Sequence, residues 1–175
     1  MVIGTNAAHG SAVATGTSIT YTPTAGYAGP DSFTYTATNA GGTSSPATVT
    51  ITVSPPTITY TPSSPAAGTV GVAYSQSVAG ASGGAAPYTY TIASGALPAG
   101  ITLAANGTLS GTPTANGTFN FTVKATDSST GTGPFNKTSG TLTLTIAAPT
   151  ISYTPTNPLP ATVGTAYSRS LASAT

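Results

Sequence analysis

The sequence predicts an all-β protein of antiparallel β-sandwich modules joined in tandem, without substantial helix. Three observations support this prediction: apolar and polar residues alternate in many segments, turn residues separate these segments, and one long stretch occurs twice. Alternation places one face of a strand in a core and the other in solvent. Apolar residues nowhere keep helical spacing over ten or more residues, so we expect no helix longer than about one turn.

Residues 1–54 supply four or five candidate strands. They are expected near residues 2–5, 11–14, 17–22, 31–38 and 46–53. Phe33, Tyr35 and Ala37 alternate with threonines in the fourth strand, and Gly41-Gly42 marks the reversal after it. Because a sandwich module has about seven strands, we expect this part to be the C-terminal part of a module whose opening strands are missing.

Residues 55–148 are expected to form a complete module. Seven strands are predicted near residues 57–61, 72–79, 87–93, 101–104, 107–110, 117–126 and 139–147. Asn106-Gly107 and Asn116-Gly117 can supply the positive φ angles of tight turns, and Gly83-Gly84 marks another reversal. The residues predicted to face the core are Tyr90, Ile92, Leu109, Phe119, Phe121, Val123, Leu142 and Leu144.

A long stretch of the middle module begins again near the end of the chain. PTITYTP at 56–62 returns as PTISYTP at 149–155, and GTVGVAYSQSVAGAS at 68–82 returns as ATVGTAYSRSLASAT at 161–175. Residues 149–175 are therefore expected to be the opening strands of a further module of the same kind. Prolines near 55–56 and 149 stiffen the two joints, because proline fixes φ and lacks an N–H donor.

Two motifs resemble known repeat families. YTPTAGYAGPDSFTYTATNAGGTSSPATVTITV, residues 21–53, resembles the closing half of the cadherin-like or bacterial Ig-like repeats of large bacterial surface proteins. Residues 73–129, with LPAGITL, GTLSGTP and a strand ending in ATD, resemble the "putative Ig" repeats of the same class. The resemblance covers nearly the whole chain and implies tandem Ig-like sandwiches. We therefore expect these residues to be one part of a longer array of such modules.

Charge and cysteine content limit the partners. Three Lys or Arg and two Asp or Glu give a net charge of +1, too little to attract nucleic acid or an anionic membrane surface. Without cysteine, neither a disulfide nor a thiolate metal site can form. No apolar run approaches the roughly 18 residues of a membrane span, so we expect no direct membrane insertion.

The ionisable residues do not predict an active site. Asp31 and Asp127 fall in different modules, and His9 is interpreted as a solvated turn residue before Gly10. Calcium binds between cadherin repeats, but a hard cation needs several carboxylates, and neither joint has an acidic cluster. We therefore predict no enzyme, no cofactor, and no catalytic or metal-binding residue. Both aspartates are expected to accept backbone N–H bonds in turns.

Other side chains have a plain structural interpretation beside a functional one. Lys124 is expected to face solvent rather than to form an isopeptide crosslink. Asn-x-Ser/Thr sequons would mark exposed positions; they occur at Asn106, Asn116, Asn120 and Asn136. Tyrosines on the strands could stack on a glycan, but core or rim positions are favoured; these are Tyr60, Tyr74, Tyr88 and Tyr90.

Two functional hypotheses follow. The favoured one, implied by the resemblance, is a set of structural spacer modules in an extracellular repeat protein, such as a stalk, fibre or adhesin shaft on a bacterial surface. Its expected partners are neighbouring modules of the same array, with self-association into fibres as a further prospect. The alternative is a carbohydrate-binding or accessory module of a secreted enzyme.

Overall fold

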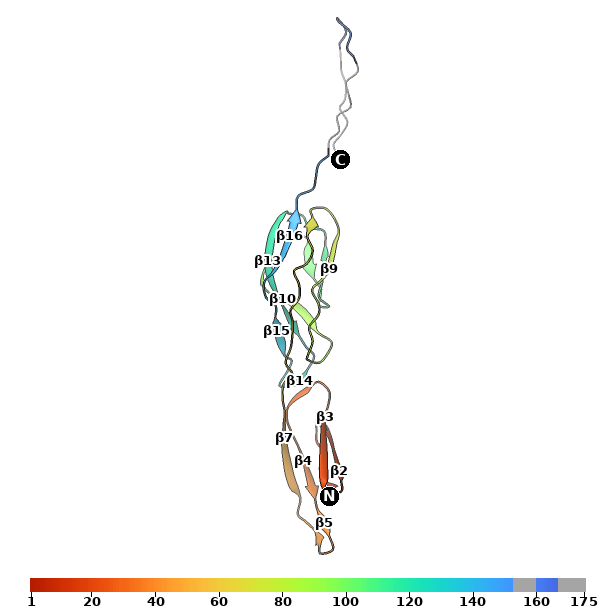
Figure 1. The fold of residues 1–175 in the computed structure, drawn as a ribbon, viewed down its shortest axis with the longest axis vertical. Helices are drawn as coiled ribbons and strands as arrows, with labels where there is room; N and C mark the ends of the chain where they lie inside the picture. Colours follow the sequence, from red (N-terminus) through yellow and green to blue (C-terminus); the bar gives the residue numbers. More distant parts are fainter. Residues whose placement is uncertain (153–159, 167–175) are drawn as a thin grey trace.

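The computed structural model describes residues 1–152 and 160–166. Sixteen strands and no helix occur in this part of the chain, which confirms the all-β prediction. Residues 1–54 are called the first module below and residues 55–148 the middle module, as the sequence divides them. The two modules lie end to end along the long axis of the molecule (Figure 1). No helix in the described ranges is long and apolar enough to cross a membrane.

The first module is built around one long strand, β4. Its strands are β1 (Val2–Ile3), β2 (Gly10–Thr15), β3 (Ser18–Pro23), β4 (Tyr27–Thr36), β5 (Thr38–Asn39), β6 (Gly42–Thr43) and β7 (Ala47–Val53). Strands β1 and β7 pair antiparallel with β4, while β2 and β3 form a separate hairpin, as do β5 and β6. All five predicted strands are present. Strand β4 begins before the expected position because Gly29 still pairs with Val53, and Tyr27 and Ala28 pair with Thr130 and Gly131.

The middle module consists of two antiparallel sheets with one short parallel addition. Its strands are β8 (Gly68–Thr69), β9 (Tyr74–Ser77), β10 (Thr89–Gly95), β11 (Ile101–Leu103), β12 (Thr108–Gly111), β13 (Gly117–Thr126), β14 (Thr130–Gly131), β15 (Asn136–Thr138) and β16 (Leu142–Ala147). One sheet has the order β10-β13-β16-β8, with β15 beside β13, and the other has the order β11-β12-β9. Strand β14 belongs to neither sheet and pairs with β4 of the first module.

The predicted strand at 57–61 is wrong. Thr59 makes only an isolated bridge with Ser82, in which each N–H donates to the other carbonyl at 2.9 Å. Prolines at 55, 56 and 62 flank this segment, and because proline has no N–H donor, a ladder cannot extend past either end of it. The segment is held instead by a side chain, since the Tyr60 hydroxyl donates to the Val78 carbonyl at 2.7 Å.

The core lies between the two sheets of the middle module, as alternation predicts. Tyr90, Leu109, Phe121, Val123, Leu142 and Leu144 are buried. Ile92 and Phe119 are half-buried and pack against this cluster, so the predicted face is correct but these two positions lie at its rim. The first module has a smaller core, in which Phe33 and Ala28 are the buried apolar residues.

The predicted opening strands of a further module fall in residues 149–175, of which 153–159 and 167–175 lie outside the described residues. In the described remainder, the Thr165 N–H donates to the Thr162 carbonyl at 3.1 Å, around Gly164 at a φ of 81°. The corresponding bond in the middle module joins Val72 and Thr69 at 3.2 Å, around Gly71 at 79°. The repeated sequence therefore forms the same turn twice.

Candidate functional site at the joint between the modules

The structure separates the two carboxylates and places His9 near only one of them. Asp31 lies in β4 of the first module, and Asp127 follows β13 in the middle module. His9 is exposed, as predicted, but its ring also stacks on Tyr27, with centroids 4.0 Å apart and planes at 7°. Within the described residues, no group of three or more His, Cys, Asp or Glu could hold a metal ion.

Asp31 ties the start of the chain to β4. Its carboxylate accepts N–H bonds from Ala8 and His9 at 3.0 Å and from Ser32 at 2.8 Å, and the Tyr21 hydroxyl donates to it at 2.8 Å. The predicted role as an acceptor of backbone N–H bonds is confirmed, but the predicted turn is wrong, because Asp31 lies within strand β4 and two of its partners are distant in sequence. Burial alone would raise the pKa of Asp31, but the hydrogen bonds outweigh burial and lower it. Burial and then this carboxylate raise the pKa of Tyr21 to about 12.

Asp127 organises the loop that follows β13. It is 5% exposed and accepts N–H bonds from Ala85 at 3.1 Å, Ser129 at 3.2 Å and Phe135 at 2.7 Å, together with the Ser129 hydroxyl. The predicted turn role is confirmed. Burial alone would raise the pKa of Asp127, but the bond from the Ser129 hydroxyl and the three N–H bonds lower it below the ordinary value.

The loop held by Asp127 reaches across the joint and pairs with the first module. Strand β14 runs parallel to the start of β4, with Thr130 opposite Tyr27 and Gly131 opposite Ala28. The Thr130 N–H donates to the Gly26 carbonyl at 2.8 Å, and the Thr132 N–H donates to the Ala28 carbonyl at 2.9 Å. Ala28 is fully buried under this contact. The joint is therefore a backbone ladder between modules as well as a proline linker.

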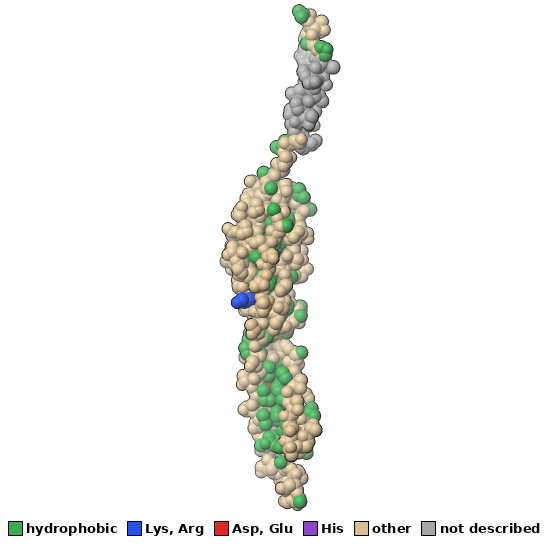
Figure 2. All heavy atoms as spheres, in the orientation of Figure 1, with side chains coloured by type: hydrophobic (Ala, Val, Ile, Leu, Met, Phe, Trp, Pro, Cys, Tyr) green, Lys and Arg blue, Asp and Glu red, His purple; other side chains and the backbone are tan. Residues whose placement is uncertain are grey.

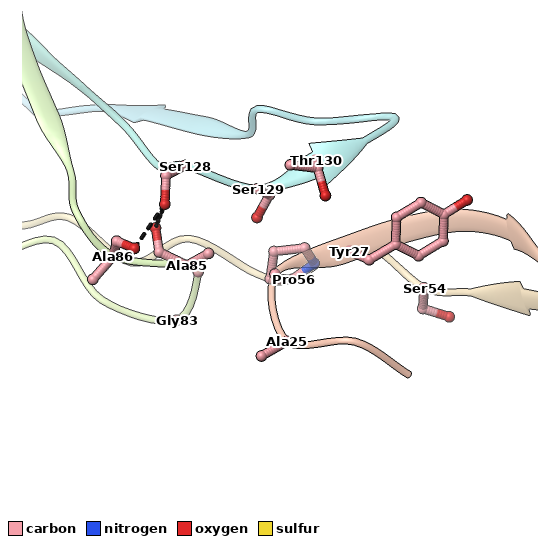
Figure 3. A pocket seen from close by; sticks show the side chains of 12 residues that line it. Ala25, Tyr27, Ser54, Pro56, Gly83, Ala85, Ala86, Ser128, Ser129 and Thr130 are labelled. Carbon is pink, nitrogen blue, oxygen red and sulfur yellow. Dashed lines mark hydrogen bonds between the residues drawn. The ribbon is translucent and has the colours of Figure 1, made fainter. Parts of the chain in front are cut away.

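A cleft of about 540 Å³ lies beside this ladder. Figure 3 shows Tyr27, Ala25 and Pro56 on one side and the segment Ser128 to Thr130 on the other. The Ser128 hydroxyl donates to the carbonyls of Ala86 at 2.7 Å and Ala85 at 3.1 Å, so its polar group is already used within the protein. The lining is small and uncharged. The Ser128 bonds lie within the middle module, and the cleft has no ionisable side chain except the Tyr27 phenol.

The tyrosines proposed as a glycan platform are part of the fold. Tyr60, Tyr74 and Tyr90 are buried, and Tyr88 is half-buried against the core. All four hydroxyls bond to backbone: Tyr60 and Tyr74 donate to carbonyls, whereas Tyr90 and Tyr88 accept N–H bonds. The favoured core and rim interpretation is confirmed, and the exposed platform that the alternative requires is not formed by these residues.

The remaining polar candidates lie on the surface. Lys124 alternates with buried Val123 and Ala125, which places it on the outer face of its sheet as predicted. The four sequon asparagines, at 106, 116, 120 and 136, are all exposed. Basic side chains are sparse on the face in Figure 2, where most of the surface is uncharged.

Sequence reasoning missed the contact between β14 and β4. Two-residue strands are too short to show alternation, and Thr130 and Gly131 are ordinary loop residues. The glycine is nevertheless required, because Gly131 has a φ of 78° and a Cβ there would overlap the Ala28 carbonyl oxygen. A glycine in a loop after a long strand was the available signal, but it does not identify the segment that approaches it.

The solved structures similar to the chain are protocadherin ectodomains. They include protocadherin gamma B2 extracellular cadherin domains 3–6 (10% identity, TM-score 0.37), the protocadherin gamma B4 extracellular domain (16%, 0.37) and human protocadherin-24 EC1-2 (12%, 0.32). The matches cover 90%, 90% and 68% of this chain, but only 45%, 30% and 65% of those chains. No curated protein matches the sequence.

Two family profiles match the sequence itself. The family described as "Bacterial Ig domain" matches residues 1–52, and the family described as "Putative Ig domain" matches residues 55–147. Both resemblances drawn from the sequence motifs are therefore confirmed. Because the second match covers more than half of the chain and coincides with the two-sheet middle module, the chain belongs to the "Putative Ig domain" family.

Proposed function

We propose that these modules are structural spacers of an extracellular repeat protein, a stalk, fibre or adhesin shaft on a bacterial surface. The observation that carries the proposal is the joint, in which β14 pairs with β4 and keeps the two sandwiches end to end. Bacterial Ig domains are commonly extracellular structural or adhesion modules, which supports the same location. In such an array, each module contacts only its neighbours, so the number of modules sets the reach.

The chemistry of the surface also favours a spacer over an enzyme. The two aspartates accept bonds from backbone N–H groups and from the hydroxyls of Tyr21 and Ser129, and the described residues contain no group of three or more His, Cys, Asp or Glu. A general acid and base must converge on one reacting group. Outward-facing hydroxyls and a net charge of +1 give such a rod few strong nonspecific contacts.

The carbohydrate-binding alternative has no specific observation in its favour. It requires several exposed aromatic rings on one face, and the tyrosines considered for it are in the core or at its rim. The stacked pair of His9 and Tyr27 is a single aromatic contact beside the joint.

Small-angle X-ray scattering of residues 1–175, combined with glycan-array binding, tests the proposal. We expect the distance distribution of a rod and no retained glycan. A globular distribution would contradict the spacer function, because the joint would not hold the modules apart. Saturable binding of one glycan class with a micromolar Kd would instead support the carbohydrate-binding alternative.

A further inference from the structure

We infer that the middle module carries a second docking edge, residues 114–117, which receives the loop of a following Ig-like module. In the first module, carbonyls within residues 26–29 accept N–H bonds from the loop 128–133, and residues 114–117 would accept the same bonds from the following module. The inference rests on the proposed spacer function for its partner, a further module of the same array. It assigns the surface and the contact by which such an array continues.

The central strands of the two modules correspond in register. Gly29 pairs with Val53 near the start of β4, and Gly117 pairs with Ile146 at the start of β13. Val53 and Ile146 each stand at the same distance before the Pro-Thr-Ile repeat. Both glycines adopt positive φ angles, 136° and 146°. Gly29 and Gly117 are therefore equivalent positions, each at the end of its module from which the chain continues.

The correspondence continues along both strands. Phe33-Thr34 in β4 matches Phe121-Thr122 in β13, and the two phenylalanine side chains are buried, at 4% and 1% exposure. Ala37-Thr38 then matches Ala125-Thr126. The same offset makes Asn39 the equivalent of Asp127, and each residue stands at the start of the loop that follows its strand.

These two loops also begin with the same turn. The Asn39 side chain accepts the Gly41 N–H at 2.8 Å, and the Asp127 side chain accepts the Ser129 N–H at 3.2 Å. Each module thus has an acceptor edge at the start of its central strand and a loop at the end of that strand. In the joint described above, the loop of one module meets the edge of the module before it.

The acceptor atoms of the second edge follow from the register. The carbonyls of Gly26 and Ala28 receive the loop in the first joint, and the equivalent residues are Thr114 and Asn116. Both are exposed. The Thr114 N–H is held by the Ala99 carbonyl at 3.0 Å, which fixes the backbone of the edge. Within the described ranges, neither the Thr114 nor the Asn116 carbonyl accepts a hydrogen bond. Two backbone acceptors are thus presented together at this end of the rod.

The chain itself brings the next module to this edge. It leaves the middle module at the end of β16, where Ile146 lies opposite Gly117, as it leaves the first module at Val53 opposite Gly29. The sequence of the middle module then begins again, and its first turn, around Gly164, repeats the geometry of the turn around Gly71. The occupant argued for is therefore the loop of that following module.

The loop must have a glycine at its point of closest approach. Gly131 has a φ of 78°, and a Cβ on it would overlap the Ala28 carbonyl oxygen of the opposite edge. Gly71 has nearly the same φ, 79°, but nothing lies near its Cβ position. A Cβ at position 131 would therefore strain the backbone and also block the contact with the opposite edge. A Cβ at position 71 would strain the backbone only.

The experiment extends the full chain by a copy of residues 83–148, joined after Thr175, because Thr175 corresponds to Ser82. Amide hydrogen exchange is then measured by NMR for Thr130 and Thr132 and for their counterparts in the added module. We expect both pairs to be protected. Gly131→Ala in the added module should speed exchange of its two amides by at least about tenfold, and Gly164→Ala, the matched strain control, should not.

Fast exchange of the added pair in the unsubstituted chain, with Thr130 and Thr132 still protected, would overturn the inference. Equal acceleration by the two alanine substitutions would also overturn it. If the hybrid module does not fold, residues 149–175 are replaced by residues 56–82, so that the last module is a full copy of the middle one. Glycan binding by the chain would contradict the proposed function and leave these exchange rates unaffected.

Discussion

At the scale of single residues, the chain buries two carboxylates in an almost uncharged protein and satisfies both with hydrogen bonds. Asp31 and Asp127 are 8% and 5% exposed. A buried charge is costly unless polar partners replace water. Within the described residues, every buried side-chain nitrogen and oxygen has a hydrogen-bond partner. The two aspartates thus join segments that are distant in sequence.

The free energy of unfolding should depend on pH in the acid range. The hydrogen bonds lower the pKa of both aspartates in the folded state, whereas an unfolded aspartate has a pKa of about 3.9. Their contribution is complete above the unfolded value and is lost as the pH falls through the lowered folded values. Urea unfolding should show a constant midpoint from about pH 5 to 8 and a falling one below about pH 4. A midpoint that rises on acidification would contradict this prediction.

Phe121 should be among the residues whose truncation destabilises the middle module most. Its side chain is 1% exposed at the centre of the core. Phe121→Ala should lower the free energy of unfolding by roughly 3 to 5 kcal/mol, because truncation removes apolar contacts and leaves a cavity. Phe119→Ala is the matched control on the same strand and should cost less, since Phe119 is half-buried. Equal losses in urea unfolding would show that the core was assigned wrongly.

At the scale of elements, long strands followed from alternation and short ones did not. Strand β13 has the bounds predicted for it, because Phe119, Phe121 and Val123 alternate with polar residues over its length. Strands β8, β14 and β15 have two or three residues each, and β8 and β14 depend on partners from distant parts of the chain. The segment 57–61 shows the opposite case, in which alternation is present but the ladder is reduced to one bridge.

Removal of the Tyr60 hydroxyl tests how that segment is held. Tyr60→Phe keeps the ring in the core but leaves the carbonyl of Val78, a residue 1% exposed, without its donor. We expect a loss of about 1 to 2 kcal/mol in the free energy of unfolding. Tyr88→Phe is the control, because the half-buried Tyr88 hydroxyl accepts from Gly84 in a position that water can reach. A smaller effect for Tyr60→Phe than for Tyr88→Phe would contradict the anchoring role.

Gly131→Ala in the chain 1–175 should open the observed joint. A side chain at this position meets the first module, whereas Gly71→Ala introduces the same backbone strain in open space. Residual dipolar couplings should fit one alignment tensor for both modules in the unsubstituted chain and in Gly71→Ala. Two tensors are expected for Gly131→Ala. A common tensor in all three proteins would show that β14 does not fix the joint.

At the scale of the whole molecule, backbone hydrogen bonds connect the two modules at a joint that has no acidic cluster among the described residues. The first module contributes carbonyls from Gly26 and Ala28, and the middle module contributes N–H groups from Thr130 and Thr132. Asp127, the nearby carboxylate, accepts bonds from its own module. A stiff connection of this kind requires no ion between the modules.

Chelation should therefore leave the stability of the chain unchanged. A bound ion stabilises the folded state in proportion to its affinity, and a hard cation held tightly needs several oxygen ligands with charge among them. We expect the same Tm in EDTA and in millimolar calcium by differential scanning calorimetry. A Tm that falls in EDTA and recovers with calcium would contradict this expectation.

The sequence by itself determined the all-β class, most long strands, the inward face of the middle module and the backbone role of both aspartates. These features depend on neighbours along the chain, because the two-residue period of a strand shows directly which side chains face the core. Only the tertiary structure decided the joint. The contact between Gly131 and Ala28 joins residues far apart in sequence through backbone atoms, which every residue has in common. Side-chain patterns therefore cannot predict it, and the register of β4 and β13 could be compared only after both had been placed.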